Sequence, residues 1–312
     1  MMKKLFIIPI IVFCLSPLNA QRVIGYYPQW VQNSFTPDNI DYDVITHVIH
    51  SFAWPDEQGN ILHYDNMLSQ SVNNTVHDNG AKILLCFGGW GQSWGFSASM
   101  STPELREIFI DNIISVCETY NYDGVDIDWE QPVNATEKNN LTTFIAELRQ
   151  AFDDLYPDWI ISMAVPVSNW SGQYYDFSQL KQSVDFFNAM TYDIHGAWTD
   201  HAGHNSPLYQ SPPGDPDGSV NTGINYLVNT RGIESQKVNV GIPFYGKEYN
   251  TSGINQAFTG DVVSRLYNEY HGLINNGWNY IWDSNGQVPY LQNTSQNKII
   301  TIDDSLSVSI KS

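Results

Sequence analysis

Short apolar segments rich in β-branched residues alternate along the chain with longer amphipathic segments. Strand character is found in residues 22–27, 45–53, 82–88, 124–129, 159–165, 186–192 and 238–243. Between several of these, apolar residues recur at helical spacing, as in residues 103–120 and 135–155. Strands that alternate with helices predict a parallel sheet whose two faces are covered.

The number of these strands favours one large α/β barrel. Seven strands in one chain indicate a (β/α)8 TIM-type barrel, and no Gly-x-Gly-x-x-Gly turn follows the first strand, as a dinucleotide-binding sheet would need. Residues 246–300 interrupt the pattern with many Asn, Gly, Tyr and Trp residues. We expect a small α+β insertion subdomain there, after strand 7, within a barrel domain of residues 21–312.

The first twenty residues, MMKKLFIIPIIVFCLSPLNA, have the layout of a signal peptide. A basic start precedes an apolar run at residues 5–15, and Ala20 ends a small-residue cleavage site. The run is too short to span a bilayer, and Cys14 lacks the small residues that usually precede a lipidated cysteine. We therefore expect a secreted chain, extracellular or periplasmic, that starts near Gln21 and has no membrane anchor.

Composition narrows the class of partner. Of the 312 residues 42% are hydrophobic and 15% charged, which is typical of a globular protein. The 33 acidic and 14 basic residues give a formal charge of −19. Such a surface repels phosphate backbones, so nucleic acid is excluded as a partner, whereas a neutral polymer is compatible with it.

Cysteine and histidine patterns give no sign of a metal. After cleavage only Cys86 and Cys117 remain, both in apolar segments, where two buried free thiols are favoured over a disulfide. CxxC, HExxH and clustered-histidine patterns do not occur. The sequence therefore predicts no metal site and no cofactor.

Acidic and apolar residues alternate in DGVDIDWE, residues 123–130. In a strand, Asp126, Asp128 and Glu130 share one face at a spacing of about 6.5–7 Å, and Trp129 points to the other face. Three inward carboxylates repel each other, so at least one pKa must rise until a proton is held at neutral pH. This arrangement predicts a catalytic site at the carboxyl end of the strand, whereas Asp123, before the alternation, is expected to be structural. A calcium site is disfavoured, because Val, Ile and Trp separate the acids.

Several stretches together resemble one enzyme family. DGVDIDWE resembles the DGxDxDWE signature of the family 18 glycoside hydrolases, the chitinases. KILLCFGGW is similar to that family's third-strand SxGG pattern, and FNAMTYDIHGAW to its sixth-strand MxYD pattern. HNSPLY and GIPFYGKEY also resemble family segments, so the likeness runs from about Arg22 to the C-terminus. It implies endo-type hydrolysis of chitin, a β-1,4-linked N-acetylglucosamine polymer, by a retaining, substrate-assisted mechanism on a TIM barrel.

The resemblance also implies roles for five residues. Glu130 matches the general acid/base, and Asp128 the residue that orients the acetamido N–H of the substrate. Asp126 matches its proton-sharing partner. Tyr192 matches a hydroxyl donor to the acetamido group, and Asp193 a hydrogen-bonding residue near the −1 sugar and Glu130.

Aromatic residues supply candidate sugar subsites, because sugar rings stack on indole faces. Trp90, Trp198 and Trp30 follow or end predicted strands, and Trp198 is favoured because it lies near the Tyr192–Asp193 corner. For each of them core packing is the alternative. The remaining predicted substrate-binding residues are Tyr26, Phe52, Gly89 and Met190. His195, a lone histidine after the corner, is expected to be a structural hydrogen-bonding residue.

The chain departs from the family pattern in three places. Cys86 stands where the family has Ser, which weakens a hydrogen bond, and Lys247 stands where it often has Arg, which loses the planar fork. After residue 304 only SLSVSIKS follows, so we expect this chain to lack the eighth strand and its −1 subsite Trp. A barrel without that strand cannot close. An incomplete gene is the favoured explanation over completion by a partner or a degenerate relative, and we expect this chain alone to be poorly soluble or inactive.

Other functions stay open at this point. An endo-β-N-acetylglucosaminidase that acts on glycoprotein glycans would share the fold, and so would a non-catalytic chitin-binding lectin, although lectins usually lose the acid that Glu130 matches. An amylase-like or cellulase-like barrel is disfavoured, because it places its acids on separate strands. The expected partner is chitin or chitooligosaccharides, bound by a monomer.

Overall fold

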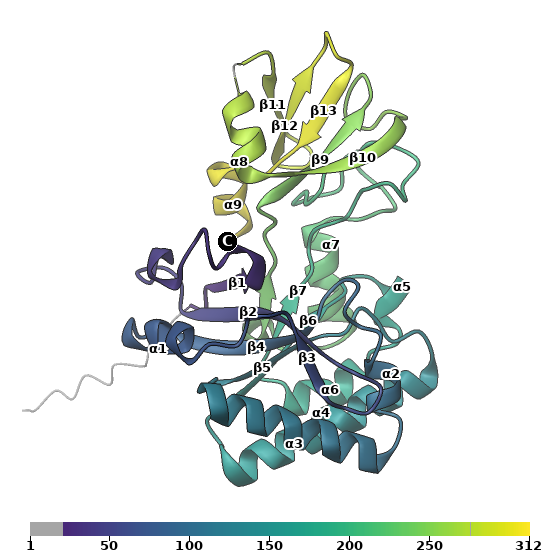
Figure 1. Cartoon of the computed structure of the whole chain (residues 1–312). Helices are drawn as coiled ribbons and strands as arrows, with labels where there is room; N and C mark the ends of the chain where they lie inside the picture. The colour runs from purple at the N-terminus through teal and green to yellow at the C-terminus, as the bar shows by residue number, and fades with distance from the viewer. Residues whose placement is uncertain (1–20, 275) are drawn as a thin grey trace, which may run out of the picture.

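The chain folds around one curled parallel sheet. The structure is a computed structural model that describes residues 21–274 and 276–312, and the predicted signal peptide at residues 1–20 lies outside them. In this part of the chain the sheet has seven parallel strands in the order β1-β2-β4-β5-β6-β7-β8 (Figure 1). They are β1 (Ile24–Pro28), β2 (His47–Pro55), β4 (Lys82–Gly88), β5 (Gly124–Asp128), β6 (Ile160–Val165), β7 (Phe186–Ala189) and β8 (Val238–Val240). All seven strands match segments predicted from the sequence.

The strands form because their apolar runs are covered on both faces. In β4, KILLCFG, every residue after Lys82 is buried, as expected for a central parallel strand. Strand β7 is shorter than predicted, because the N–H of Thr191 turns back to the carbonyl of Ala189 at 2.8 Å. A short strand, β3 (Ile61–His63), pairs antiparallel with the end of β2.

Two long helices cover one face of the sheet and have the predicted bounds, α3 (Pro103–Tyr120) and α4 (Ala135–Leu155). The side chains of Thr102 and Asn134 accept the first free backbone N–H groups of these helices, which sets where each begins. Phe109 of α3 stacks on Phe144 of α4 with ring centroids 5.0 Å apart, and both rings are fully buried. Truncating either ring to Ala would cost about 3–5 kcal/mol of folding free energy.

The remaining helices are short. The α-helices are α1 (Gln70–Asp78), α2 (Phe96–Ser99), α5 (Asn169–Gly172), α6 (Phe177–Ser183), α7 (Val220–Asn225), α8 (Tyr267–Tyr270) and α9 (Ser305–Lys311). Single 3-10 turns occur at η1 (Gln29–Val31), η2 (Pro37–Asn39), η4 (Ser235–Lys237) and η5 (His271–Leu273), and a π-helical turn, η3 (Tyr226–Thr230), continues α7.

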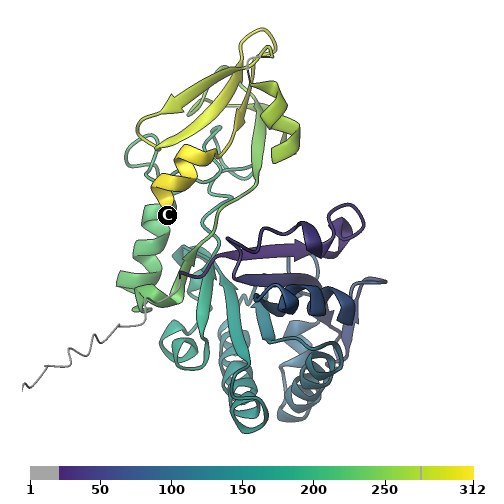
Figure 2. The ribbon, with the colours of Figure 1, turned by 90° about the vertical axis from the view of Figure 1, so that its left-hand side faces the viewer.

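A second, antiparallel sheet follows β8. Its strands lie in the order β10-β9-β13-β12-β11, and Figures 1 and 2 show it on the side of the parallel sheet away from α3 and α4. The strands are β9 (Tyr245–Asn250), β10 (Thr259–Leu266), β11 (Asn279–Asp283), β12 (Val288–Asn293) and β13 (Lys298–Thr301). A small core of its own holds it together: Tyr270, Trp278, Leu291, Ile300 and Ile302.

The fold class is thus the predicted α/β TIM type, present as a seven-stranded, half-barrel sheet. Within residues 21–274 and 276–312, β1 and β8 are the outer strands and no strand pairs them with each other. After β13 the chain forms α9. Cys86 and Cys117 are buried free thiols, as predicted. No helix in the described ranges is both long and apolar enough to cross a lipid bilayer.

Candidate active site

Asp126 lies at the centre of the parallel sheet, where side chains from four other strands, β1, β4, β6 and β7, donate hydrogen bonds to it. The Tyr26 hydroxyl (2.9 Å) and the Cys86 thiol (3.2 Å) donate to its Oδ2. The Ser162 hydroxyl (2.5 Å) and the Asn188 amide (3.1 Å) donate to its Oδ1. Burial raises the pKa of Asp126, and these donors act against that rise. Because four donors favour the anion, Asp126 is suited to carry a negative charge although it is buried.

Asp128, two residues further along β5, has the opposite surroundings. It is 6% exposed, and no group in the described part of the chain donates a hydrogen bond to its Oδ1. Burial, then the charges of Glu130 and Asp126, raise its pKa well above the usual range. A buried oxygen without a donor is rare in folded proteins and requires an explanation.

Glu130 follows the end of β5 and is partly buried. Its backbone N–H donates to Ser93 Oγ at 2.9 Å, which fixes the chain at this position. Burial, then the charge of Asp193, raise the pKa of Glu130 to about 6. A carboxyl group with this pKa can hold and deliver a proton near neutral pH.

The predicted alternation along this strand is confirmed. Trp129 points away from the acids, is 4% exposed and stacks on Phe96 with centroids 5.5 Å apart. The neighbouring strand comes so close that a Cβ at Gly88 would lie 2.1 Å from the carbonyl oxygen of Asp128. Gly89 donates its N–H to that same oxygen at 2.8 Å. The Gly-Gly pair therefore lets the ends of β4 and β5 meet.

Asp123 is structural, as predicted. Its carboxylate lies 2.7 Å from His77 Nε2 and 2.7 Å from Lys82 Nζ. It also accepts the backbone N–H of Ile83 at 2.8 Å, which ties the beginning of β5 to β4.

The Tyr192–Asp193 corner reaches the acids from the end of β7. Burial, then the charges of Asp128 and Glu130, raise the pKa of Tyr192, whose ring packs edge-on against Tyr245. Asp193 adopts a left-handed conformation with φ of 55°. Lys247 of β9 lies with its Nζ 2.8 Å from Asp193 Oδ1, so the lysine that replaces the family's arginine has an ionic partner.

The three predicted subsite tryptophans all present exposed indole rings, with Trp90 the most open at 85% exposure. Trp30 stacks on Phe52 at a centroid distance of 6.2 Å. Trp198 lies over Lys247, 5.7 Å from Nζ to the ring centroid. Exposed aromatic faces are available for sugar rings, and their role in binding stays a prediction.

The other predicted binding residues lie among these groups. Gly89 packs against the Phe52 ring, since a Cβ there would come 2.8 Å from it. Tyr26 directs its hydroxyl to Asp126. Met190 is partly buried and donates its N–H to Val165 at 3.0 Å.

Sequence reasoning missed a hollow beside Glu130. It has a volume of about 350 Å³, and its lining includes Ser93, Trp94 and Gln131. The signal lay in the stretch GWGQSWG after the third predicted strand, where a second tryptophan follows Trp90 by four residues. Trp94 is therefore a further candidate for contact with a ligand held at Glu130.

Comparison with known proteins identifies the family of the chain. The family model described as glycosyl hydrolases family 18 matches residues 22–312. A probable endochitinase of Caenorhabditis elegans is 31% identical over 324 residues, covering 90% of this chain and 52% of that protein. The chain thus spans about half the length of this curated relative.

Solved structures show the same likeness. A group IV chitinase of Ostrinia furnacalis in complex with allosamidin has a TM-score of 0.86 at 26% identity, covering 93% of this chain and 87% of that one. A group II chitinase catalytic domain of the same species, a mutant in complex with (NAG)5, has a TM-score of 0.84 at 27% identity, covering 93% and 85%. The chain belongs to glycosyl hydrolase family 18.

Proposed function

We propose that this chain carries the catalytic site of a secreted endo-acting chitinase. The observation that carries the proposal is the buried Oδ1 of Asp128, which has no donor in the described residues and lies two positions before a carboxyl group whose pKa is about 6. An N-acetylglucosamine residue would supply an amide N–H for the first group and a glycosidic oxygen for the second.

The proposed mechanism uses the substrate as its own nucleophile. Glu130 protonates the glycosidic oxygen, while the carbonyl oxygen of the N-acetyl group attacks the anomeric carbon and displaces the leaving sugar with retention overall. Asp128 accepts the acetamido N–H and stabilises the positive oxazolinium ion that forms. Glu130 then takes a proton from water, whose oxygen opens that ion.

Asp126 and Tyr192 assist in the proposed mechanism. Asp126 has four hydrogen-bond donors, whereas burial and the charges of Glu130 and Asp126 raise the pKa of Asp128 well above the usual range, so in the proposed mechanism the two carboxyl groups share one proton. Asp126 draws that proton towards itself when the cationic intermediate forms. Tyr192 lies close to the same acids, and its hydroxyl donates a hydrogen bond to the acetamido oxygen of the substrate.

The proposed substrate fits the surface around the acids. Trp90, Trp198 and Trp30 offer exposed rings on which sugars stack. A neutral polymer is compatible with the formal charge of −19. Relatives in this family have been solved with allosamidin and with (NAG)5. We include secretion, from the signal-peptide pattern at residues 1–20, and a monomeric state in the proposal.

The test is Glu130→Gln in the full chain. Release of products from chitooligosaccharides, followed by mass spectrometry, should fall about 10²–10⁴-fold, while retention on chitin beads stays near that of the unchanged protein. Glu107→Gln, an exposed position on α3, is the matched control and should leave both readouts unchanged.

Three outcomes contradict the proposal. A folded, unchanged protein that binds chitin without hydrolysing it would be a lectin. Cleavage of glycoprotein glycans in place of chitin would make it an endo-β-N-acetylglucosaminidase. Equal activity of the Glu130→Gln protein would remove Glu130 from the mechanism.

A further inference from the structure

Four side chains of residue types that can hold a metal ion meet in the loop of residues 190–219, which joins β7 to α7. They are His195, His201, Asp215 and Asp217, and one ligand atom from each lies within 4.8 Å of all the others. The side chains of His195 and Asp215 are fully buried, whereas that of Asp217 is 32% exposed. We call these four residues the His–Asp cluster.

The hydrogen bonds of the two histidines direct both Nε2 atoms into the cluster. His195 Nδ1 lies 2.8 Å from the backbone carbonyl of His204, and His201 Nδ1 lies 2.8 Å from Asp200 Oδ1. Both partners only accept, so each Nδ1 carries a hydrogen and the Nε2 of each neutral ring has a free lone pair. An acceptor that binds the other ring nitrogen and so fixes the tautomer is typical of metal-binding histidines.

These lone pairs face oxygen atoms that are themselves acceptors. His195 Nε2 lies 3.0 Å from Asp215 Oδ2 and 3.6 Å from Asp217 Oδ2. His201 Nε2 lies 3.3 Å from the same Asp215 oxygen. Acceptors that face each other in a buried place need either a hydrogen or a metal ion between them.

The spacing fits a tetrahedral metal ion. Ligands about 2.0–2.2 Å from zinc stand roughly 3.3–3.6 Å apart at the corners of a tetrahedron, close to the three separations above. Two imidazoles and two carboxylates neutralise a divalent cation. Imidazole ligands select against calcium and magnesium, and tetrahedral geometry selects for zinc among the metals that imidazole suits.

We propose that the His–Asp cluster binds one zinc ion as a structural site. Four protein ligands leave no open position, as in zinc sites that hold a fold together. The Asp217 N–H donates to Asp215 Oδ1 at 2.9 Å, so the two carboxylates are prearranged by their own turn. A Cβ at Gly203 would lie 2.1 Å from the His195 ring, so only glycine leaves room for that ring there.

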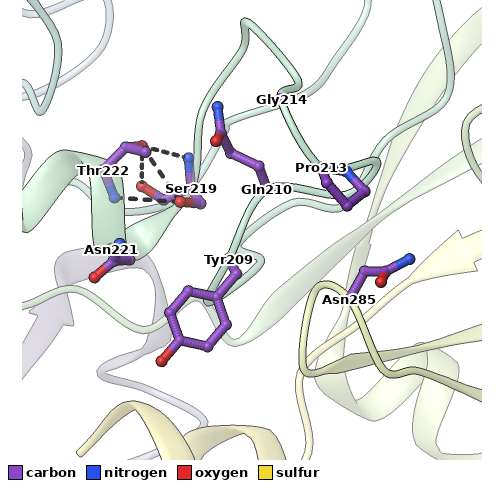
Figure 3. Close-up of a pocket in the computed structure, with 8 residues that line it drawn as sticks. All are labelled: Tyr209, Gln210, Pro213, Gly214, Ser219, Asn221, Thr222 and Asn285. Atoms are coloured by element: carbon purple, nitrogen blue, oxygen red, sulfur yellow. Dashed lines mark hydrogen bonds between the residues drawn. The ribbon is translucent and has the colours of Figure 1, made fainter.

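The position of the cluster indicates what the ion would stabilise. It links the two ends of one long loop, since His195 lies two residues after Asp193 and Asp217 two residues before Ser219, which caps α7. Figure 3 shows that cap, the Ser219–Thr222 hydrogen bonds, beside a hollow of about 250 Å³ whose lining includes Gln210 and Gly214 of the same loop. The ion would therefore hold in place the segment that carries Asp193 and Trp198.

The sequence predicted no metal site, and the proposed zinc ion differs from that prediction. The two histidines are separated by five residues and the two aspartates by one, with fourteen positions from His201 to Asp215, which matches no common zinc spacing. His195, expected as a structural hydrogen-bonding residue, becomes a ligand here, although its Nδ1 makes the hydrogen bond that was expected of it.

The test measures metal binding and does not depend on chitinase activity. The full chain is stripped with a chelator, supplied with ZnCl2 and desalted, and zinc is counted by mass spectrometry. We expect about one zinc per chain and, because zinc binds the folded state, a Tm higher by about 5 °C or more. Cobalt in place of zinc should give the intense visible absorption of a tetrahedral site.

Two variants locate the ion. His201→Ala and Asp217→Ala change the less buried ligands, so the protein should still fold, and each should weaken zinc binding about 100-fold or more. His63→Ala, an exposed histidine outside the cluster, is the control and should retain one zinc. The proposal is overturned if the unchanged chain keeps no zinc and shows no change in Tm, or if both cluster variants bind zinc as the unchanged chain does. Either result would make the cluster a hydrogen-bonded network of histidines and aspartates.

Discussion

The two ends of strand β5 carry aspartates in opposite surroundings. Asp123, before the strand, accepts hydrogen bonds or ionic contacts from His77, Lys82 and Ile83 at 2.7–2.8 Å. Asp128, at the other end, has an oxygen with no donor in residues 21–274 and 276–312, and burial, then the charges of Glu130 and Asp126, raise its pKa. A carboxylate with donors on both oxygens stabilises a fold, whereas one that lacks them costs stability and is retained for what it binds.

The largest expected effect is a loss of activity at the carboxyl end of β5. Asp128→Asn removes the charge that would stabilise a cationic intermediate, so kcat on chitooligosaccharides should fall at least about 100-fold. The free energy of unfolding should stay equal or rise, because a neutral amide of the same shape removes the cost of a buried acid whose pKa is raised. Steady-state kinetics and urea unfolding on the same preparation check both parts. Activity within tenfold of the unchanged protein would mean that the two ends of β5 do not differ in function.

At the amino end of β5 a substitution should lower the stability of the protein. Asp123→Ala leaves the N–H of Ile83 and the side chains of His77 and Lys82 without their acceptor, and should lower the free energy of unfolding by about 2–4 kcal/mol. The kcat of the folded fraction should not change. Asp153→Ala, which removes an exposed carboxylate that pairs with Arg149 on α4, is the control and should cost about 0.5 kcal/mol or less. A similar loss in both variants would refute the structural role of Asp123.

Glu130→Gln should stabilise the protein, but only in one range of pH. The folded pKa of about 6 lies above the ordinary value of 4.5, so Glu130 opposes folding once the pH rises through that interval. The free energy of unfolding of the Gln variant should exceed that of the unchanged protein by roughly 2 kcal/mol at pH 7 or above, and this excess should vanish below about pH 4.5. Urea unfolding of both proteins at pH 4 and pH 7.5 measures it. For the same reason the kcat/KM of the unchanged protein should fall above about pH 6, as Glu130, the proposed general acid, loses its proton.

Local patterns in the sequence were sufficient to predict the framework. The seven parallel strands were found because each is a short apolar run, and α3 and α4 because Thr102 and Asn134 stand before helical periodicity. The inward acids and the outward Trp129 followed from the two-residue repeat of a strand. These features depend on residues that are neighbours in the sequence.

Contacts between distant segments could not be predicted in this way. Tyr26 and Asn188 reach Asp126 from 100 and 62 residues away, because strand register, which a single sequence does not reveal, places them there. The pairing of Lys247 with Asp193 depends on the second sheet, which folds over the end of β7. The His–Asp cluster needs a long loop to close on itself, so its ligand spacing follows no local pattern.

The prediction with the smallest expected effect concerns Lys247. This lysine pairs with Asp193, an acid outside β5 whose charge acts on Glu130. The charge of Asp193 raises the pKa of Glu130, and Lys247 lies 2.8 Å from Asp193. Lys247→Met removes the compensating charge, so the pKa of Glu130 should rise further and the alkaline limb of the kcat/KM profile should move to higher pH. Lys247→Arg keeps the charge and should leave that limb in place, with kcat changed no more than a few-fold. A shift to lower pH in the Met variant would show that Lys247 acts on Glu130 by some route other than Asp193.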